Sequence, residues 1–139
     1  MDAFILIDAG PIIAYYDSRD AWHQRVTAYF ETAVGQFVTT SACITESLFA
    51  LRGDFRVQNE LLLDLARGLY VSEPLVPLDF SRIAELNAKY YDVPGAFADL
   101  SLIAISEWLN IEAIASLASD IDIYRRYGKH HFKRVFPQR

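Results

Sequence analysis

The sequence has very little cysteine and no hydrophobic run long enough to cross a membrane. Its single cysteine, Cys43, can form neither an internal disulfide nor a thiolate cluster for zinc, which favours a reducing, cytoplasmic location. The longest apolar stretch, residues 100–109, contains Ser101, Ser106 and Glu107 and is too short for a bilayer. No basic region precedes the apolar residues near the N-terminus. We therefore expect neither a signal peptide nor a membrane anchor.

Internal repeats, linkers and nucleotide-binding fingerprints are also missing. Neither a P-loop nor a glycine-rich dinucleotide motif occurs in the sequence. Of the 139 residues, 53% are hydrophobic and 22% are charged, which excludes a disordered or low-complexity chain. A chain of this length can bury a self-sufficient core, so the sequence predicts a single domain over residues 1–139.

Acidic residues are absent from the C-terminal segment, residues 124–139, although they dominate the rest of the chain. This segment holds six basic residues, whereas the other 123 residues carry 7 basic and 18 acidic side chains, a net charge of −11. The basic segment could pair with the acids of the body, or it could contact phosphates. The second interpretation makes five residues candidates for RNA binding: Arg125, Arg126, Lys129, Lys133 and Arg134.

Short apolar runs alternate with amphipathic segments along the whole chain. Strands are predicted at residues 4–7, 36–39, 69–71, 112–117 and 132–136, and helices at 12–16, 20–33, 41–53, 55–67, 79–90 and 97–109. Strands that alternate with helices are typical of parallel sheets. The pattern predicts an α/β fold, a three-layer α/β/α sandwich with a mainly parallel central sheet.

Three carboxylates lie in apolar segments, where an unpaired charge is costly. Asp8 follows the first predicted strand, where parallel α/β sheets bind ligands, although it could simply cap the next helix. Glu46 is the only charged residue between Glu31 and Arg52, and its alternative is a buried structural carboxylate. Asp99 opens an apolar helix, where it could also act as a cap. Each acid alone has a structural explanation, so the argument rests on all three together.

Acids from separate segments on one side of a parallel sheet would converge on a small volume. Because like charges repel, such a cluster makes sense chiefly around a divalent cation. Oxygen ligands without histidine or cysteine select Mg²⁺ or Mn²⁺. A cation of this kind activates water and stabilises charge on a phosphate, so the cluster indicates phosphodiester hydrolysis.

Three motifs together resemble one family. Residues 5–14 (ILIDAGPIIA), 41–46 (SACITE) and 98–104 (ADLSLIA) look like the PIN-domain family, most closely the VapC-type toxins of bacterial toxin–antitoxin pairs. The resemblance extends over nearly the whole chain. It implies a Mg²⁺- or Mn²⁺-dependent endoribonuclease that cuts structured RNA such as tRNA or rRNA and is neutralised by a VapB-like antitoxin. It assigns metal binding to Asp8, Glu46 and Asp99.

Two positions depart from the family pattern. Ala118 stands two residues after Ser116, where similar toxins usually carry an aspartate, and Ala96 replaces an acid that many relatives have three residues before the third catalytic aspartate. Asp120 is the candidate for the missing fourth acid. The departures motivate an alternative, a catalytically weakened PIN module that acts by binding its antitoxin or RNA.

Other patterns give weaker hypotheses. The resemblance suggests a homodimer, and an exposed aromatic set could contribute to a dimer face or an antitoxin groove: Tyr90, Tyr91 and Phe55. The adjacent histidines 130 and 131 would point to opposite faces of a strand, which disfavours a shared metal. A receiver-like phosphoacceptor domain needs an acidic pair after the first strand and a lysine at the end of the fifth. It is disfavoured, because Asp8 stands alone and the only lysines are Lys89, Lys129 and Lys133.

Overall fold

The sheet is parallel throughout. The computed structural model describes residues 3–93 and 97–136. Within these residues, one sheet has the strand order β3-β2-β1-β4-β5, and every pairing is parallel. The strands are β1 (Phe4–Ile7), β2 (Gln36–Thr39), β3 (Tyr70–Ser72), β4 (Ala113–Ala115) and β5 (Lys133–Phe136). The predicted α/β class and parallel sheet are confirmed.

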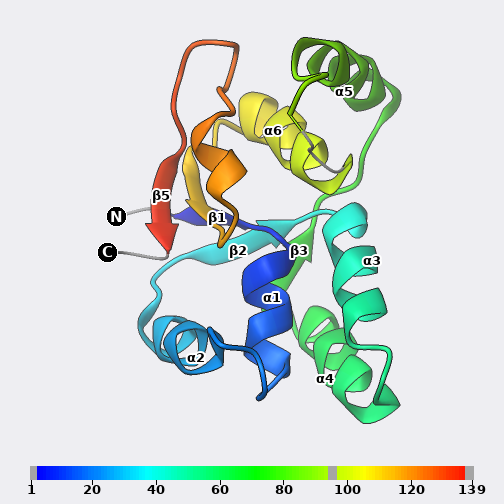
Figure 1. Cartoon of the computed structure of the whole chain (residues 1–139), viewed down its shortest axis with the longest axis vertical. Coiled ribbons are helices and arrows are strands. Elements are labelled where there is room, and N and C mark those ends of the chain that lie inside the picture. Colours follow the sequence, from blue (N-terminus) through cyan, green and yellow to red (C-terminus); the bar gives the residue numbers. More distant parts are fainter. Residues whose placement is uncertain (1–2, 94–96, 137–139) are drawn as a thin grey trace.

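Helices cover both faces of the sheet (Figure 1). They are α1 (Ala9–Tyr16), α2 (His23–Thr32), α3 (Ser41–Ala50), α4 (Phe55–Ala66), α5 (Pro77–Lys89) and α6 (Phe97–Leu109), with a short 3-10 helix at Ser119–Asp122. In Figure 1, α5 and α6 lie above the sheet, and α1, α2 and α4 lie below it. The arrangement is the three-layer sandwich that the alternating pattern predicts.

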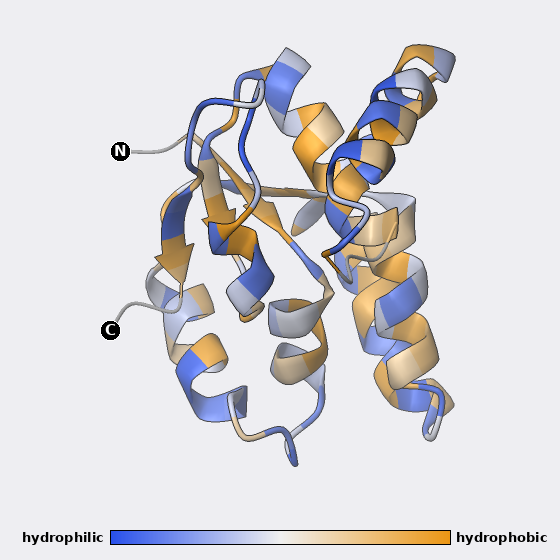
Figure 2. Ribbon diagram, turned by 45° about the horizontal axis from the view of Figure 1, so that its top comes forward, coloured by the Kyte–Doolittle hydropathy of each residue, from blue (hydrophilic) through white to orange (hydrophobic). Residues whose placement is uncertain are grey.

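The core consists of two apolar clusters, one on each side of the sheet. Alternate residues of a strand point to opposite faces. Leu6 of β1 belongs to the cluster that contains Leu86 of α5 and Ile103 of α6, whereas its neighbour Ile7 belongs to the cluster that contains Ile12 of α1. All five side chains are fully buried. The strands are drawn largely in the hydrophobic colour in Figure 2, as expected for a sheet covered on both faces.

The order of the strands reverses at β1. From β1 the chain continues through β2 to β3 on one side, and it then returns to place β4 and β5 on the other side. In open parallel sheets, the crevice at such a reversal, outside the carboxyl ends of the strands, is where ligands bind. The reversal here falls between β1 and β4, whose carboxyl ends are followed by Asp8 and Ser116.

Several predicted boundaries differ from the structure. The helix predicted to begin at Asp79 begins at Pro77, because Asp79 is its third residue and accepts a hydrogen bond from the Val76 N–H (2.8 Å). The helix predicted at 12–16 already begins at Ala9, while the prediction for 97–109 matches α6. In the described ranges, no helix is long and apolar enough to span a membrane.

Candidate functional site

Asp8 is a buried carboxylate that serves two neighbours. It is the N-cap of α1, and its Oδ1 accepts a hydrogen bond from the Gly10 N–H (3.2 Å). Its Oδ2 accepts a short hydrogen bond from the Ser116 hydroxyl (2.5 Å), which comes from the residue after β4. Only 5% of Asp8 is exposed. Asp8 therefore caps α1, as the structural alternative predicts. Its second carboxylate oxygen is bound by Ser116, the residue that follows β4.

The charge of Asp99 acts on Asp8. Burial, aided by the negative charge of Asp99, raises the pKa of Asp8 to about 7, although the Ser116 hydrogen bond opposes both effects. Asp99 is the third residue of α6 and is partly buried. Two acids that are 91 positions apart in the sequence thus lie close enough in the fold for the charge of one to raise the pKa of the other.

Ser116 organises the loop that follows β4. Its hydroxyl donates to Asp8 and accepts a hydrogen bond from the Ala118 N–H (3.1 Å). This side chain is fully buried. The residue therefore fixes both the carboxylate of Asp8 and the course of the backbone toward Ala118.

Glu46 does not lie in the environment that the sequence predicts. It is exposed on α3, whereas its helix neighbours Cys43 and Ser47 are buried. Its surroundings in the sequence are apolar, but the helix turns Glu46 toward solvent, so the alternative of a buried structural carboxylate is wrong. Among residues 3–93 and 97–136, no three His, Cys, Asp or Glu side chains gather closely enough to hold a metal ion.

Asp120 and Asp99 both act on the same buried residue, Tyr124. The negative charges of Asp99 and Asp120 both help to raise the pKa of Tyr124 to about 12, after burial as the main cause. Asp120 is partly buried in the 3-10 helix, and Tyr124 is buried. Within the described part of the chain, the Tyr124 hydroxyl is buried without a hydrogen-bond partner.

The two alanines that replace expected acids differ in what can be said of them. Ala118 is exposed directly after the Ser116 loop, at the N-cap of the 3-10 helix. Ala96 lies outside the described residues. The loop that carries Ala118 continues into the helix of Asp120, so Asp120 is the acid that follows the vacant position most closely in the chain.

The five basic candidates are not equivalent. Arg126 is buried, and its Nη2 donates to the Ser106 carbonyl (3.3 Å) and to the Asn110 side chain (3.0 Å). It is therefore not available for the RNA contact that the sequence suggested. Arg125 donates to backbone carbonyls of its own segment, at residues 122–124. Lys129 and Lys133 are exposed, as phosphate-binding residues should be.

Arg134 also contacts the chain itself. Its guanidinium donates to the carbonyls of Ser116 (3.1 Å) and Ala118 (3.0 and 3.1 Å), and it pairs with Asp122 (3.4 Å). Its positive charge lowers the pKa of Asp8. The hypothesis of an RNA contact overlooked this role, because a position in a basic run does not reveal which carbonyls a long side chain reaches.

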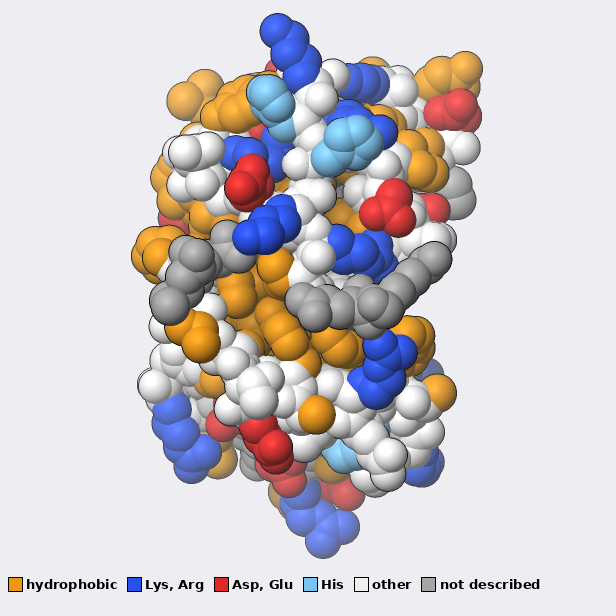
Figure 3. Space-filling model, turned by 90° about the vertical axis from the view of Figure 1, so that its left-hand side faces the viewer, with side chains coloured by type: hydrophobic (Ala, Val, Ile, Leu, Met, Phe, Trp, Pro, Cys, Tyr) orange, Lys and Arg blue, Asp and Glu red, His pale blue; other side chains and the backbone are white. Residues whose placement is uncertain are grey.

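The face that carries β5 is mixed in charge. Figure 3 shows Lys, Arg and His side chains gathered over its upper half, with acidic side chains among them. The interpretation that the segment pairs with acids holds for Arg134, which pairs with Asp122. The phosphate contact stays a prediction for Lys129, which is exposed.

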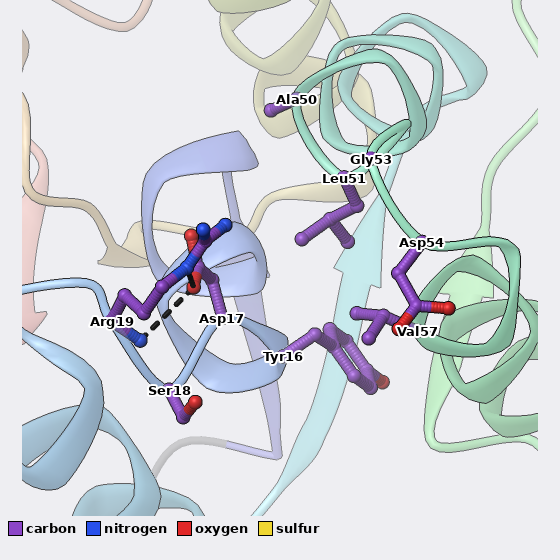
Figure 4. Close-up of a pocket in the computed structure, with 9 residues that line it drawn as sticks. All are labelled: Tyr16, Asp17, Ser18, Arg19, Ala50, Leu51, Gly53, Asp54 and Val57. Carbon is purple, nitrogen blue, oxygen red and sulfur yellow. Dashed lines mark hydrogen bonds and ion pairs between the residues drawn. The ribbon is translucent and has the colours of Figure 1, made fainter.

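A separate cleft lies at the far end of α1. It has a volume of about 400 Å³ and is bounded by Tyr16 and Asp17 on one side and by the junction of α3 and α4, near Leu51 and Asp54, on the other (Figure 4). At 1.5 Å per residue, the eight residues of α1 separate it from Asp8. We assign the candidate chemistry to the carboxyl ends of β1 and β4, not to this cleft.

The aromatic residues suggested for a dimer face or an antitoxin groove differ in exposure. Tyr91 and Phe55 are 85% and 68% exposed. Tyr90 is partly buried, its hydroxyl accepts a hydrogen bond from the Arg125 N–H (3.1 Å), and its ring meets that of Tyr124 edge to face. Tyr90 is therefore chiefly a packing residue.

Comparison with solved structures identifies the fold. The chain is similar to the Mycobacterium tuberculosis toxin VapC20, described as a sarcin–ricin loop cleaving toxin, with a TM-score of 0.77 and 14% sequence identity. The match covers 84% of this chain and 91% of VapC20. No family model matches the sequence, and no curated protein matches it. The five-stranded parallel sheet flanked by helices is thus a PIN-like fold.

Proposed function

We propose that this chain is a divalent-metal-dependent endoribonuclease of the VapC toxin type, which hydrolyses phosphodiester bonds in structured RNA such as tRNA or rRNA. One observation carries the proposal: a buried aspartate, held by Ser116, lies at the reversal of strand order in a PIN-like sheet, within electrostatic reach of Asp99. The similar fold of VapC20, a sarcin–ricin loop cleaving toxin, supports it.

The donor set fits a hard cation in part. Asp8 and Asp99 supply carboxylate oxygens. The raised pKa of Asp8 is caused chiefly by burial and also by repulsion from Asp99, which a cation between them would relieve. When bound, Mg²⁺ or Mn²⁺ would stabilise negative charge on the phosphate that is cut. Asp8 and Asp99 would hold the ion, and Glu46 and Asp120 would complete the acidic set after a local rearrangement. Lys129 and Lys133 would contact RNA phosphates.

The partners in this proposal follow from the same fold. A VapB-like antitoxin would neutralise the nuclease, and the toxin would act as a homodimer. A short reading frame next to this gene, encoding a DNA-binding protein that forms a complex with this chain, would support the assignment of the antitoxin.

The deciding experiment is RNA cleavage by the purified chain without antitoxin. We would incubate it with total tRNA and with rRNA in Mn²⁺, in Mg²⁺ and in EDTA, and compare it with Asp8→Asn and Asp99→Asn. Asparagine retains the oxygen that caps α1, so Asp8→Asn removes charge with little change in shape. We expect cleavage that requires the metal and falls at least about 100-fold in Asp8→Asn.

A matched control is Asp17→Asn, the same exchange at the opposite end of α1. Asp17 accepts a hydrogen bond from the Arg19 N–H (3.0 Å), and its variant should cut RNA as the unaltered chain does. Cleavage that survives in Asp8→Asn, or that persists in EDTA, would contradict the proposal.

A second candidate function is an RNA- or antitoxin-binding module that cuts poorly. It is favoured by Ala118 in place of an acid and by the exposed position of Glu46. Under this alternative, the chain would retain tRNA in a binding assay, and neither Mn²⁺ nor Asp8→Asn would change the amount of intact RNA.

A further inference from the structure

The last strand of the sheet reaches back to the loop that holds Asp8. Arg134 lies on β5, next to β4, and its side chain is only 22% exposed. Two of its nitrogens donate to the carbonyls of Ser116 and Ala118, on either side of Leu117. A guanidinium offers donors in a rigid plane, so it can hold two carbonyls in a fixed relation.

The loop that Arg134 grips determines where the Ser116 hydroxyl lies. This hydroxyl accepts from the Ala118 N–H and donates to Asp8 Oδ2. A continuous chain of hydrogen bonds thus runs from Arg134, through the backbone at 116 and 118, to one carboxylate oxygen of Asp8. The other oxygen is held by Gly10. Each end of the carboxylate is therefore oriented by a separate part of the fold.

We infer that Arg134 is a positioning residue for the metal-binding carboxylate of Asp8, acting through the Ser116–Ala118 loop, and not an RNA-contacting residue. The inference rests on the proposed function. Groups that orient metal ligands from outside the coordination shell typically change metal affinity 10- to 100-fold when they are removed. Position 118 of this loop is an alanine and offers no side chain that could bind a metal. The role that we assign to Arg134 is therefore to hold the backbone of the loop.

The test compares Arg134→Ala, Arg134→Lys and Arg67→Ala. Arg67 also pairs with an aspartate, Asp64 (3.5 Å), but it lies at the end of α4. Mn²⁺ affinity is measured by calorimetry, stability by urea unfolding in EDTA, and tRNA binding in EDTA. Exchange of the Ala118 amide, followed by NMR, reports on the loop without any metal.

We expect Arg134→Ala to weaken Mn²⁺ binding about tenfold and to speed exchange of the Ala118 amide, with tRNA binding in EDTA unchanged. Arg134→Lys should weaken Mn²⁺ binding nearly as much, because an ammonium cannot span both carbonyls. Arg67→Ala should leave Mn²⁺ affinity and Ala118 exchange unaltered. Urea unfolding shows whether the folded state is equally populated in all three variants.

Three outcomes would overturn the inference. Equal Mn²⁺ affinity in Arg134→Ala and the unaltered chain would refute positioning while leaving the nuclease proposal intact. Full recovery in Arg134→Lys would attribute the effect to charge instead of geometry, and weaker tRNA binding with unchanged Mn²⁺ affinity would return Arg134 to the RNA surface. An unaltered chain that binds no Mn²⁺ would refute both the metal-dependent function and this inference.

Discussion

The acidic site and the basic C-terminal segment were both conspicuous in the sequence, and they behave differently in the structure. The fold places Asp8 and Asp99 near each other because strand ends and helix starts are fixed by the topology of the sheet. The cations of the segment are placed by the groups that they can reach. Arg126 is buried and Arg134 holds a loop, whereas Lys129 is exposed. Asp8 and Asp99 have short side chains and lie where their places in the sequence predict. The places of the long basic side chains in the sequence do not predict which groups they contact.

The largest effect in this comparison is expected at Arg126, the buried cation of the basic segment. Its guanidinium contacts neutral groups, the Ser106 carbonyl and Asn110, inside the protein. We expect Arg126→Ala to lower the free energy of unfolding by about 2–4 kcal/mol, since it leaves a cavity and an unpaired acceptor. Arg126→Met should cost much less, because it fills the space without burying a charge. Urea denaturation measures both, and equal losses in the two variants would contradict this explanation.

The acidic site can be sharpened by the pH dependence of stability without metal. Burial and Asp99 raise the pKa of Asp8 from 3.8 to about 7 in the folded chain. The folded state therefore binds a proton that the unfolded state releases between these values, and this group lowers stability as the pH rises through that range. In EDTA, Asp8→Asn should be stabilising at pH 8 by roughly 1–3 kcal/mol, and less so at pH 5. The same difference at both pH values would rule out the raised pKa.

Glu46 tests whether the fold alone assembles the acidic site. It is exposed in the structure, so Glu46→Gln should leave urea stability unchanged. If it joins Asp8 and Asp99 around a cation, the variant should lower RNA cleavage about tenfold, less than Asp8→Asn does, because its negative charge is lost but its shape and one oxygen are kept. Cleavage rates in a titration of Mn²⁺ provide the measurement. An unchanged rate would remove Glu46 from the proposed site.

The exposed part of the basic segment gives the smallest effect. Lys129→Ala should weaken tRNA binding about threefold and reduce the salt dependence of the binding constant by about one counterion. Binding at several KCl concentrations measures the slope. Arg67→Ala, on α4, is the matched control, and an equal loss there would show that the effect is one of net charge alone.

The sequence predicted most where a residue with clear chemistry lies at a position that the topology of the fold defines. The alternation of strands and helices predicted the sandwich, and Asp8 could be singled out because it follows a buried strand. Glu46 was misjudged because apolar neighbours in sequence do not tell which side of a helix a residue occupies, and the four-residue spacing of Cys43 and Ser47 predicts only their own shared face.

The contacts that Ser116 and Arg134 make around Asp8 could not be predicted from the sequence. A serine after a strand is common, and its contact with Asp8 joins residues 108 positions apart. The carbonyls that Arg134 reaches depend on the parallel pairing of β4 with β5, whose register shifts at Ile114 and Ala115. No local pattern encodes such a register. Asp79 shows the same limit on a smaller scale, because a cap and a third helical residue look alike in sequence.

The contact between Asp8 and Ser116 also limits when the acidic site can form during synthesis of the chain. Asp8 is made first, and its partner Ser116 is added 108 residues later. At ribosomal rates of about 5–20 residues per second, roughly 5–20 seconds separate the two. During that time the nascent chain has no assembled acidic site. The long separation in sequence therefore delays assembly of the proposed nuclease site until Ser116 has been added.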